Sequence, residues 1–281
     1  MRIHSSIDDM RAASRAARLT GLRVGLVPTM GALHDGHLSL VRAAKSQCDV
    51  VVVSIFVNPL QFGPNEDLAK YPRTFERDCE LLEREGIDFL FAPSTEEMYP
   101  ANAVTYVTVD GLSDKLCGRS RPGHFRGVTT VVAKLVAIVE PDLAFFGQKD
   151  AAQAAIIRRM VRDLNFPAEI IVCPIVREPN GLAMSSRNAY LSPQERESAL
   201  ALYRSLSEIR RAFEQGERRT ARLIEAGKRV LAGESGVRLD YLEIVDPETL
   251  DPLLEVDRPA LVAVAAFVGS TRLIDNIVLS P

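Results

Sequence analysis

The segment Val24-Gly25-Leu26-Val27-Pro28-Thr29-Met30-Gly31-Ala32-Leu33-His34-Asp35-Gly36-His37 decides the fold that this sequence predicts. Its first four residues form an apolar run, which is typical of a short buried strand. Apolar residues then recur with helical spacing at Leu38, Val41 and Ala44. A glycine-containing turn therefore connects a strand to a helix, and such βα units bind nucleotides at the carboxyl edge of a parallel sheet.

The turn departs from the dinucleotide pattern G-x-G-x-x-G, because it carries His34 and His37 one helical turn apart with Gly36 between them. A histidine pair can ligate a metal, but no other histidine or cysteine makes a convincing third ligand. Capping or packing would be the ordinary role of a single histidine here. Two of them at a helix N-terminus favour a phosphate site, where the helix dipole adds to the field and Gly31 and Gly36 allow close approach.

The composition is that of an ordinary globular protein, with 281 residues of which 47% are hydrophobic and 25% charged. The net charge of −3 and the pI near 5.9 argue against the broad basic surface of a nucleic-acid-binding protein. A local basic pocket for a phosphorylated ligand remains compatible with that charge. We therefore expect a small-molecule ligand and no nucleic-acid partner.

The cysteines and the apolar runs indicate where the chain resides. Its 4 cysteines lie far apart without C-x-x-C spacing, as expected of free thiols in a reducing compartment. Residues 1–20 carry acidic residues and arginines without an apolar core, unlike a secretion signal. The longest apolar run, Ala260–Val268, is shorter than the about 18 residues that span a bilayer. We expect a cytoplasmic protein that does not contact a membrane.

Strands and helices alternate through the first part of the chain. Further strands are expected at Val50–Val57, Phe89–Ala92, Thr105–Val109, Leu143–Phe146 and Glu169–Cys173. Helices are expected after Ser6, at Thr74–Glu85, at Val128–Val139, and from Asp150 to Leu164. This alternation predicts an α/β, Rossmann-like, doubly wound and mostly parallel sheet in a nucleotide-binding and catalytic domain, residues 1–175.

The pattern changes near Pro174. Ser192-Pro193-Gln194-Glu195 is a capping box with proline at the first helical position, and its helix ends at Gly216. A second helix is expected at Thr220–Leu231. Three strands are expected to follow, at Leu239–Val245, Ala260–Val268 and Thr271–Val278. We therefore predict a smaller α+β lid domain, residues 176–281.

Other polar residues follow the predicted strands. Lys149, with the serines and arginine of Met184–Arg187, favours a cationic clamp for a polyphosphate over a merely solvated lysine. The amides of Asn58, Gln61 and Gln153 suit a small polar substrate, since a site that hydrogen-bonds a hydroxyl rejects analogues that lack it. Four basic residues have less specific placements, at the site, at an interface or in solvent: Arg119, Arg121, His124 and Arg126.

Five motifs together carry a family resemblance. They are PTMGALHDGH (28–37), FVNPLQFG (56–63), GHFRGVTTVV (123–132), FFGQKD (145–150) and MSSRN (184–188). The H-x-G-H turn by itself resembles the nucleotidyltransferase superfamily, which includes class I aminoacyl-tRNA synthetases. The motifs in this order resemble the pantothenate synthetase (pantoate–β-alanine ligase) family over essentially the whole chain.

The resemblance implies a reaction. Such enzymes activate the carboxylate of pantoate with ATP and Mg²⁺, giving bound pantoyl adenylate and pyrophosphate. β-Alanine then attacks the acyl carbon and yields pantothenate and AMP. The resemblance also implies a homodimer formed through the first domain. The protein ligands of Mg²⁺ remain open, since the ion can be held by ATP phosphates and water.

The resemblance also assigns roles to residues. His34, His37 and Lys149 would be catalytic, with His37 as the acid. Gln61 would contact both pantoate and β-alanine, and Gln153 would contact pantoate. ATP would be held by Met30, Gly31, Ala32, Leu33, His34, Asp35, Gly36, His37, Gly147, Gln148, Lys149, Asp150, Val176, Met184, Ser185, Ser186 and Arg187.

Other functions agree less well with these residues. Another nucleotidyltransferase, acting on a phosphorylated or nucleotide acceptor, would not need the amides of Asn58 and Gln61. A nucleotide-binding sensor without turnover would not require Lys149 together with both histidines. A tRNA synthetase is disfavoured by the acidic pI and the missing anticodon-reading domain.

Overall fold

The computed structural model describes residues 1–64 and 66–281, so Asn65 in the breaker-rich segment 58–65 lies outside the described residues. The chain forms two compact units. The first unit comprises Met1–Ser113, Arg121–Gly147 and Ile156–Pro174, and the second comprises Asp114–Ser120, Gln148–Ala155 and Ile175–Pro281. The functional division at residue 175 into a catalytic domain and a lid remains a prediction.

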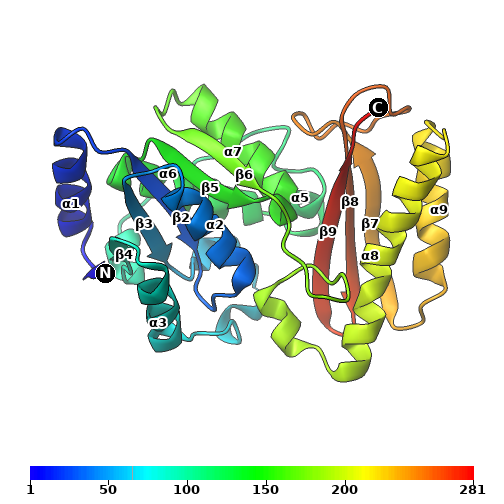
Figure 1. The fold of residues 1–281 in the computed structure, drawn as a ribbon, viewed down its shortest axis with the longest axis horizontal. Helices are drawn as coiled ribbons and strands as arrows, with labels where there is room; N and C mark the ends of the chain where they lie inside the picture. The colour runs from blue at the N-terminus through cyan, green and yellow to red at the C-terminus, as the bar shows by residue number, and fades with distance from the viewer. Residues whose placement is uncertain (65) are drawn as a thin grey trace. The chain divides into compact units, whose positions relative to one another are not determined.

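A parallel sheet forms the centre of the first unit (Figure 1). Its strand order is β1-β4-β3-β2-β5-β6. The strands are β1 Arg2–His4, β2 Val24–Thr29, β3 Val50–Ile55, β4 Phe89–Phe91, β5 Leu143–Gly147 and β6 Glu169–Cys173. The order of winding reverses between β2 and β5, and open α/β sheets bind ligands at such a point. The predicted Rossmann-like α/β fold is confirmed.

Helices alternate with the strands of this sheet along the chain and bury apolar side chains. They are α1 Ile7–Leu19, α2 Asp35–Lys45, α3 Phe75–Glu85, α4 Thr95–Met98, α6 His124–Val139 and α7 Ala151–Asp163. The Ser6 side chain caps α1 by accepting from Asp9 N, and α3 ends at Gly86, whose φ of 66° suits glycine. Two 3₁₀ turns, η1 Pro59–Gln61 and η2 Asp67–Ala69, also belong to this unit.

The structure differs from the expected elements of the first unit in three places. Thr105–Val109 is not a strand, because threonine side chains of α6 satisfy its backbone instead: Thr130 Oγ1 accepts from Val107 N at 3.0 Å and Thr129 Oγ1 donates to Val107 O at 2.6 Å. The short strand β1 was not expected, since three residues carry no readable periodicity. Helix α6 begins at His124, earlier than Val128.

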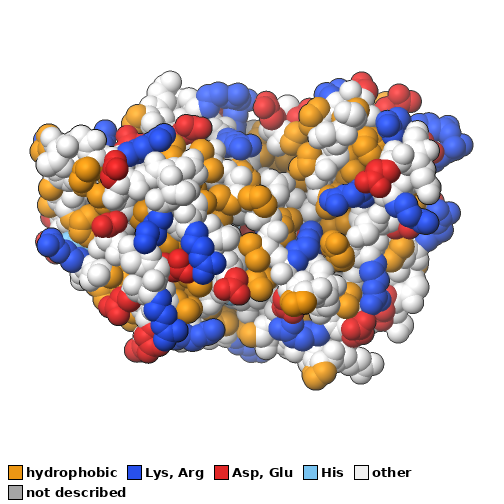
Figure 2. Space-filling model, in the orientation of Figure 1, with side chains coloured by type: hydrophobic (Ala, Val, Ile, Leu, Met, Phe, Trp, Pro, Cys, Tyr) orange, Lys and Arg blue, Asp and Glu red, His pale blue; other side chains and the backbone are white. Residues whose placement is uncertain are grey.

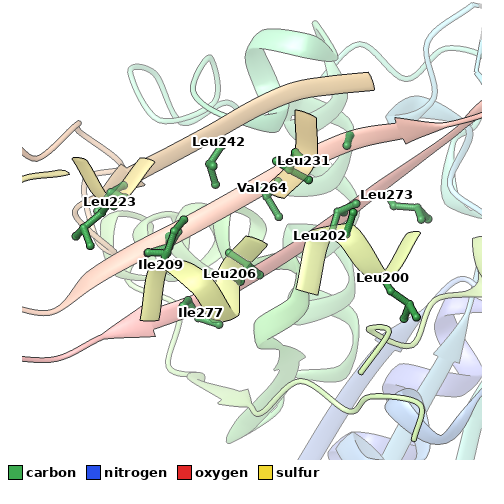
Figure 3. Close-up of a cluster of buried hydrophobic side chains, with 14 of the residues drawn as sticks. Leu200, Leu202, Leu206, Ile209, Leu223, Leu231, Leu242, Val264, Leu273 and Ile277 are labelled. Atoms are coloured by element: carbon green, nitrogen blue, oxygen red, sulfur yellow. The ribbon is translucent and has the colours of Figure 1, made fainter. Parts of the chain in front are cut away.

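The second unit contains an antiparallel sheet covered by two helices (Figure 1). The strands are β7 Val237–Val245, β8 Ala260–Val268 and β9 Thr271–Leu279, and the helices are α8 Pro193–Glu214 and α9 Thr220–Ala232. Side chains of α8, α9 and the sheet form one apolar cluster, among them Leu206, Ile209 and Val264 (Figure 3). The predicted capping box at Ser192 and Glu195 is present. The smaller C-terminal α+β part is confirmed.

Three short helical turns also belong to the second unit. They are α5 Cys117–Ser120, η3 Gln148–Asp150 and η4 Ser186–Tyr190. The expected helix at Asp150 therefore begins at Ala151, after the η3 turn. The four cysteines are free thiols, as expected.

The surface shows charges of both signs. Figure 2 shows lysine and arginine side chains interspersed with aspartate and glutamate on the visible face. Within the described part of the chain, no helix has the length and apolar character needed to cross a bilayer.

Candidate active site

The turn after β2 is held in an unusual backbone conformation. Gly31 and Ala32 both have positive φ, at 78° and 51°. Glycine adopts this region freely, whereas the Cβ of Ala32 makes it costly. The strain persists because the amides of Ala32 and Leu33 donate to the Asp78 carboxylate on α3, at 2.8 and 2.9 Å.

Asp78 is a functional candidate that sequence reasoning missed. Its side chain is only 1% exposed and also accepts from Thr74 Oγ1 at 3.1 Å. A Cβ added at Gly31 would lie 3.0 Å from Asp78 Oδ2, so the carboxylate lies directly against the turn. A signal was available, because Asp78 precedes Leu82 by four residues and so lies on the buried face of α3. A carboxylate there requires partners.

His34 and His37 cap each other's backbone at the start of α2. Gly36 N donates to His34 Nδ1 at 3.1 Å, and His34 N donates to His37 Nδ1 at 3.4 Å. Each Nδ1 is therefore an acceptor, which in a neutral imidazole places the proton on Nε2. The rings lie 4.1 Å apart between centroids. Capping and donation are thus compatible roles, because they use opposite nitrogens of each ring.

Gln61 lies beside this turn within the first unit. Its Nε2 donates to Met30 Sδ at 3.1 Å, so the segments after β2 and β3 meet. Gln61 Oε1 accepts from Asn58 Nδ2 at 3.1 Å. Asn58 is 1% exposed and caps η1 through Leu60 N. Asn58 therefore orients the side chain of Gln61.

A charged network holds the backbone of Gln61. Arg121 donates to both carboxylate oxygens of Glu66, at 2.7 and 2.6 Å, and to Gln61 O at 3.3 Å. His124 Nδ1 lies 2.8 Å from the same carbonyl. Burial disfavours the ionised form of Glu66, but the hydrogen bonds and charge of Arg121 outweigh it and lower the pKa of Glu66. Arg121 and His124 therefore support the site.

The other two basic residues of uncertain placement make other contacts. Arg119 pairs with Glu243 inside the second unit. The Arg126 guanidinium lies 4.1 Å above the centre of the Tyr106 ring. Neither contact involves a predicted site residue.

The segment Gln148–Asp150 is fixed against β9 in the second unit. Asn276 Nδ2 donates to Gln148 O at 2.9 Å and to Lys149 O at 3.0 Å, and Gln148 Nε2 donates to Asn276 Oδ1 at 2.9 Å. Lys149 Nζ lies 3.7 Å from Asp150 Oδ2. Asn276 is buried and was also missed, since nothing in its own segment marks it. Gln153 follows in α7 and is half-buried.

Val176 and Met184 are paired across a tight connection in the second unit. Met184 N donates to Val176 O at 3.0 Å, beside an antiparallel bridge between Arg177 and Ala183. Arg177 forms two hydrogen bonds with the buried Asp275, at 2.6 and 2.8 Å. The start of this connection is therefore held by β9.

Ser185, Ser186 and Arg187 begin the η4 turn. Ser185 caps it, since its Oγ accepts from Arg187 N at 3.3 Å. The predicted site residues divide between the units: Met30–His37, Gln61 and Gly147 belong to the first, and Gln148–Asp150, Gln153, Val176 and Met184–Arg187 to the second. The described residues contain no group of three or more His, Cys, Asp or Glu arranged to hold a metal ion.

The parallel sheet with a histidine-bearing βα turn defines an α/β protein with a Rossmann-like fold. A family model described as pantoate-beta-alanine ligase matches residues 2–278. A pantothenate synthetase from Koribacter versatilis is 61% identical over 279 residues, which cover 99% of this chain and 96% of that relative. One from Thermotoga neapolitana is 59% identical over 279 residues, or 99% of this chain and 100% of the relative.

Solved structures agree with this match. The crystal structure of pantothenate synthetase from Thermus thermophilus has a TM-score of 0.95 and 48% identity, and each chain is covered completely, at 100%. A pantoate-beta-alanine ligase from Francisella tularensis, complexed with beta-gamma ATP and beta-alanine, has a TM-score of 0.82 and 35% identity, covering 99% of this chain and 97% of that one. The chain belongs to the pantoate–β-alanine ligase family, so the predicted family and enzyme class are confirmed.

Proposed function

We propose that this chain condenses pantoate with β-alanine by way of a pantoyl adenylate. The match to the family over residues 2–278 carries this proposal. The relative from Francisella tularensis, in complex with an ATP species and β-alanine, supports both ligands. A carboxylate oxygen of pantoate attacks the α-phosphorus of ATP and pyrophosphate leaves. The amine of β-alanine then attacks the acyl carbon, loses a proton, and AMP leaves.

The histidines would act in the first step. Negative charge grows on the phosphate oxygens and on the departing pyrophosphate as the α-phosphorus is attacked. The Nε2–H groups of His34 and His37 are suitable donors, because backbone amides occupy the Nδ1 atoms. The resemblance makes His37 the acid, and with its Nδ1 accepting from His34 N its Nε2–H would stabilise the leaving pyrophosphate by donating a hydrogen bond to it. Loss of one such prearranged donor typically costs about 2.7–4 kcal/mol of barrier.

The second unit would supply the positive charge. Lys149, whose backbone carbonyl is held by Asn276, would pair with the phosphates, and Ser185, Ser186 and Arg187 would add donors. Gly147, Gln148, Asp150, Val176 and Met184 would line the rest of the ATP site, together with Met30–Gly36.

The glutamines would bind the organic substrates. Gln61 would contact pantoate and β-alanine, and Gln153 would contact pantoate. An acyl adenylate hydrolyses where water reaches it, so a lid has a clear purpose. We assign the catalytic domain to residues 1–175 and the lid to residues 176–281 on this reasoning.

Other features belong to the same proposal. Mg²⁺ would arrive with ATP, because magnesium usually keeps several waters and binds through substrate phosphates. We further propose a homodimer that works in the cytoplasm. The mass of the purified protein by light scattering tests the dimer directly.

An assay of AMP and pyrophosphate formation tests this proposal. It contains ATP, pantoate and β-alanine, and each substrate is omitted in turn. Pyrophosphate release should require pantoate but not β-alanine, whereas multiple turnover and AMP release require both. His37→Ala and Lys149→Ala should each reduce adenylate formation at least about a hundredfold. Lys228→Ala, a change on the exposed side of α9, is the control and should leave the rate unchanged.

Two outcomes would contradict the proposal. Pyrophosphate release that is independent of pantoate would point to another nucleotidyltransferase reaction. ATP binding without any turnover would point to a sensor. Near-normal rates of adenylate formation in His37→Ala and Lys149→Ala would contradict the phosphate clamp but not the family assignment.

A further inference from the structure

A hydrogen-bond chain runs from Tyr99 to Gln61 inside the first unit. Tyr99 Oη lies 2.9 Å from Asn58 Oδ1, and Asn58 Nδ2 lies 3.1 Å from Gln61 Oε1. Tyr99 follows α4 and is separated from Asn58 by 41 residues along the chain. Its hydroxyl therefore reaches the glutamine only through the asparagine.

Two backbone groups fix the direction of the hydrogen bonds that join Tyr99, Asn58 and Gln61. Leu60 N can only donate, and it points at Asn58 Oδ1 at 3.3 Å. Gly127 O can only accept, and it lies 3.0 Å from Asn58 Nδ2. The amide of Asn58 therefore cannot be reversed without placing like groups against each other on both sides.

The fixed orientation of the Asn58 amide also sets the donor and acceptor roles of Tyr99 and Gln61. Since Asn58 Oδ1 is an acceptor, the Tyr99 hydroxyl must donate to it. Since Asn58 Nδ2 is a donor, Gln61 must turn its Oε1 inward. The Gln61 Nε2 group is then left to face the Met30 side, where its contact is a weakly accepting sulfur at 3.1 Å.

We propose that Tyr99 is a positioning residue that holds the Asn58 side chain in place and, through it, the Gln61 side chain, whose Nε2 then donates toward its ligand. The proposal rests on the proposed function and deepens it. The ligand group that meets Gln61 must be an acceptor, such as a carboxylate, a hydroxyl oxygen or a carbonyl. A protonated amine at that position would be rejected, because Nε2 has no lone pair to offer it.

The contribution of the Tyr99 hydroxyl can be tested separately from that of the Tyr99 ring. The ring lies 6.0 Å from the Phe56 ring between centroids, and Lys134 Nζ lies 5.9 Å from the Tyr99 centroid. A phenylalanine keeps both contacts. Burial raises the pKa of Tyr99, so the hydroxyl keeps its proton throughout the working range of pH.

The decisive experiment is a double-mutant cycle of Tyr99→Phe with Gln61→Ala. Tyr99→Phe alone should raise the KM for pantoate about threefold to tenfold, the net worth of one hydrogen bond, and leave the KM for ATP unchanged. In the Gln61→Ala background the same change should have no further effect. Dissociation constants for pantoate from calorimetry complete the cycle where turnover is slow. Tyr106→Phe, an exposed tyrosine of the same unit, is the matched control.

Each outcome has a distinct meaning. An equal loss from Tyr99→Phe in both backgrounds would show that Tyr99 acts on the fold and not through Gln61, and would overturn the proposal. So would a Tyr99→Phe enzyme that behaves like Tyr106→Phe. A wild-type enzyme that forms no AMP from ATP, pantoate and β-alanine would contradict the proposed function, whatever the variants do.

Discussion

At the scale of single residues, Asp78 determines the shape of the turn after β2. Its carboxylate accepts from Ala32 N and Leu33 N and thereby holds Ala32 at a φ of 51°. These amides are used within the protein, so the proposed phosphate binding at the turn would depend on other groups. The Nε2–H groups of His34 and His37 are suitable side-chain donors of that kind.

Asp78→Asn should therefore weaken both the fold and adenylation. An asparagine keeps the shape of aspartate but places an NH₂ group against one of the two backbone donors. We expect a loss of about 1–3 kcal/mol in the free energy of unfolding, the cost of a buried unsatisfied group. Urea unfolding and the pyrophosphate assay measure the two effects. Glu80→Gln on the exposed side of α3 should change neither, and equal effects of both changes would contradict this role of Asp78.

At the scale of elements, the close approach of α6 to η1 places the Asn58 and Gln61 side chains. Gly127 allows this approach: a Cβ there would lie 2.3 Å from Leu60 O and 2.5 Å from Gln61 N. Those are backbone atoms, which cannot rotate away as a side chain does. The position therefore requires glycine because of its neighbours, since its own φ is not positive.

Gly127→Ala should displace η1 and impair substrate binding. Overpacking of this kind typically costs about 1–3 kcal/mol of stability. The displaced Gln61 should raise the KM for pantoate more than the KM for ATP. Gly111→Ala is a useful control, because its Cβ would meet nothing within 4 Å, although its φ of 79° carries strain of its own. An unchanged KM for pantoate in Gly127→Ala would contradict the placement of Gln61 by α6.

The same scale shows where element prediction succeeded. The β2–α2 unit and the α8 cap were predicted correctly because strand periodicity, glycine turns and capping boxes involve residues close together in the chain. Thr105–Val109 has strand-like residues, yet its backbone is paired by Thr129 and Thr130 of α6. The residues of 105–109 alone could not predict hydrogen-bond partners that lie about twenty residues away in the sequence.

At the scale of the whole molecule, paired carboxylates make stability depend on pH. Burial opposes ionisation of Glu66, but the hydrogen bonds and charge of Arg121 outweigh it and lower the pKa of Glu66 below its ordinary 4.5. Backbone hydrogen bonds from Thr249 do most to lower the pKa of Asp246, against the opposing effect of burial. In each case the folded state binds fewer protons than the unfolded state. The stabilisation is therefore fully present above the ordinary pKa and is lost as the pH falls through the folded value.

Glu66→Gln should be destabilising at neutral pH and nearly neutral in acid. We expect a loss of about 1.5–3 kcal/mol in the free energy of unfolding at neutral pH, the worth of hydrogen bonds to charged groups. The difference from wild type should begin to shrink below a pH of about 4.5, where the unfolded-state carboxylate takes up a proton, and should vanish once the pH is below the lowered pKa of the folded state. Urea unfolding at several pH values measures it, with the exposed Glu225→Gln as control. A difference that stays constant with pH would show that shape, and not charge, is what Glu66 contributes.

The sequence by itself determined the family and the parallel sheet, because these depend on short motifs and on periodicity between chain neighbours. Only the tertiary structure decided what holds the predicted site residues in place. Asp78 lies 46 residues from Ala32, Tyr99 lies 41 from Asn58, and Asn276 lies 128 from Gln148. Each pair meets only when the chain folds, and each supporting polar group is specified by the partner that it satisfies. The turn and its histidines could therefore be predicted from one stretch of sequence, whereas the histidine tautomers and the orientation of the Gln61 amide depend on the tertiary structure.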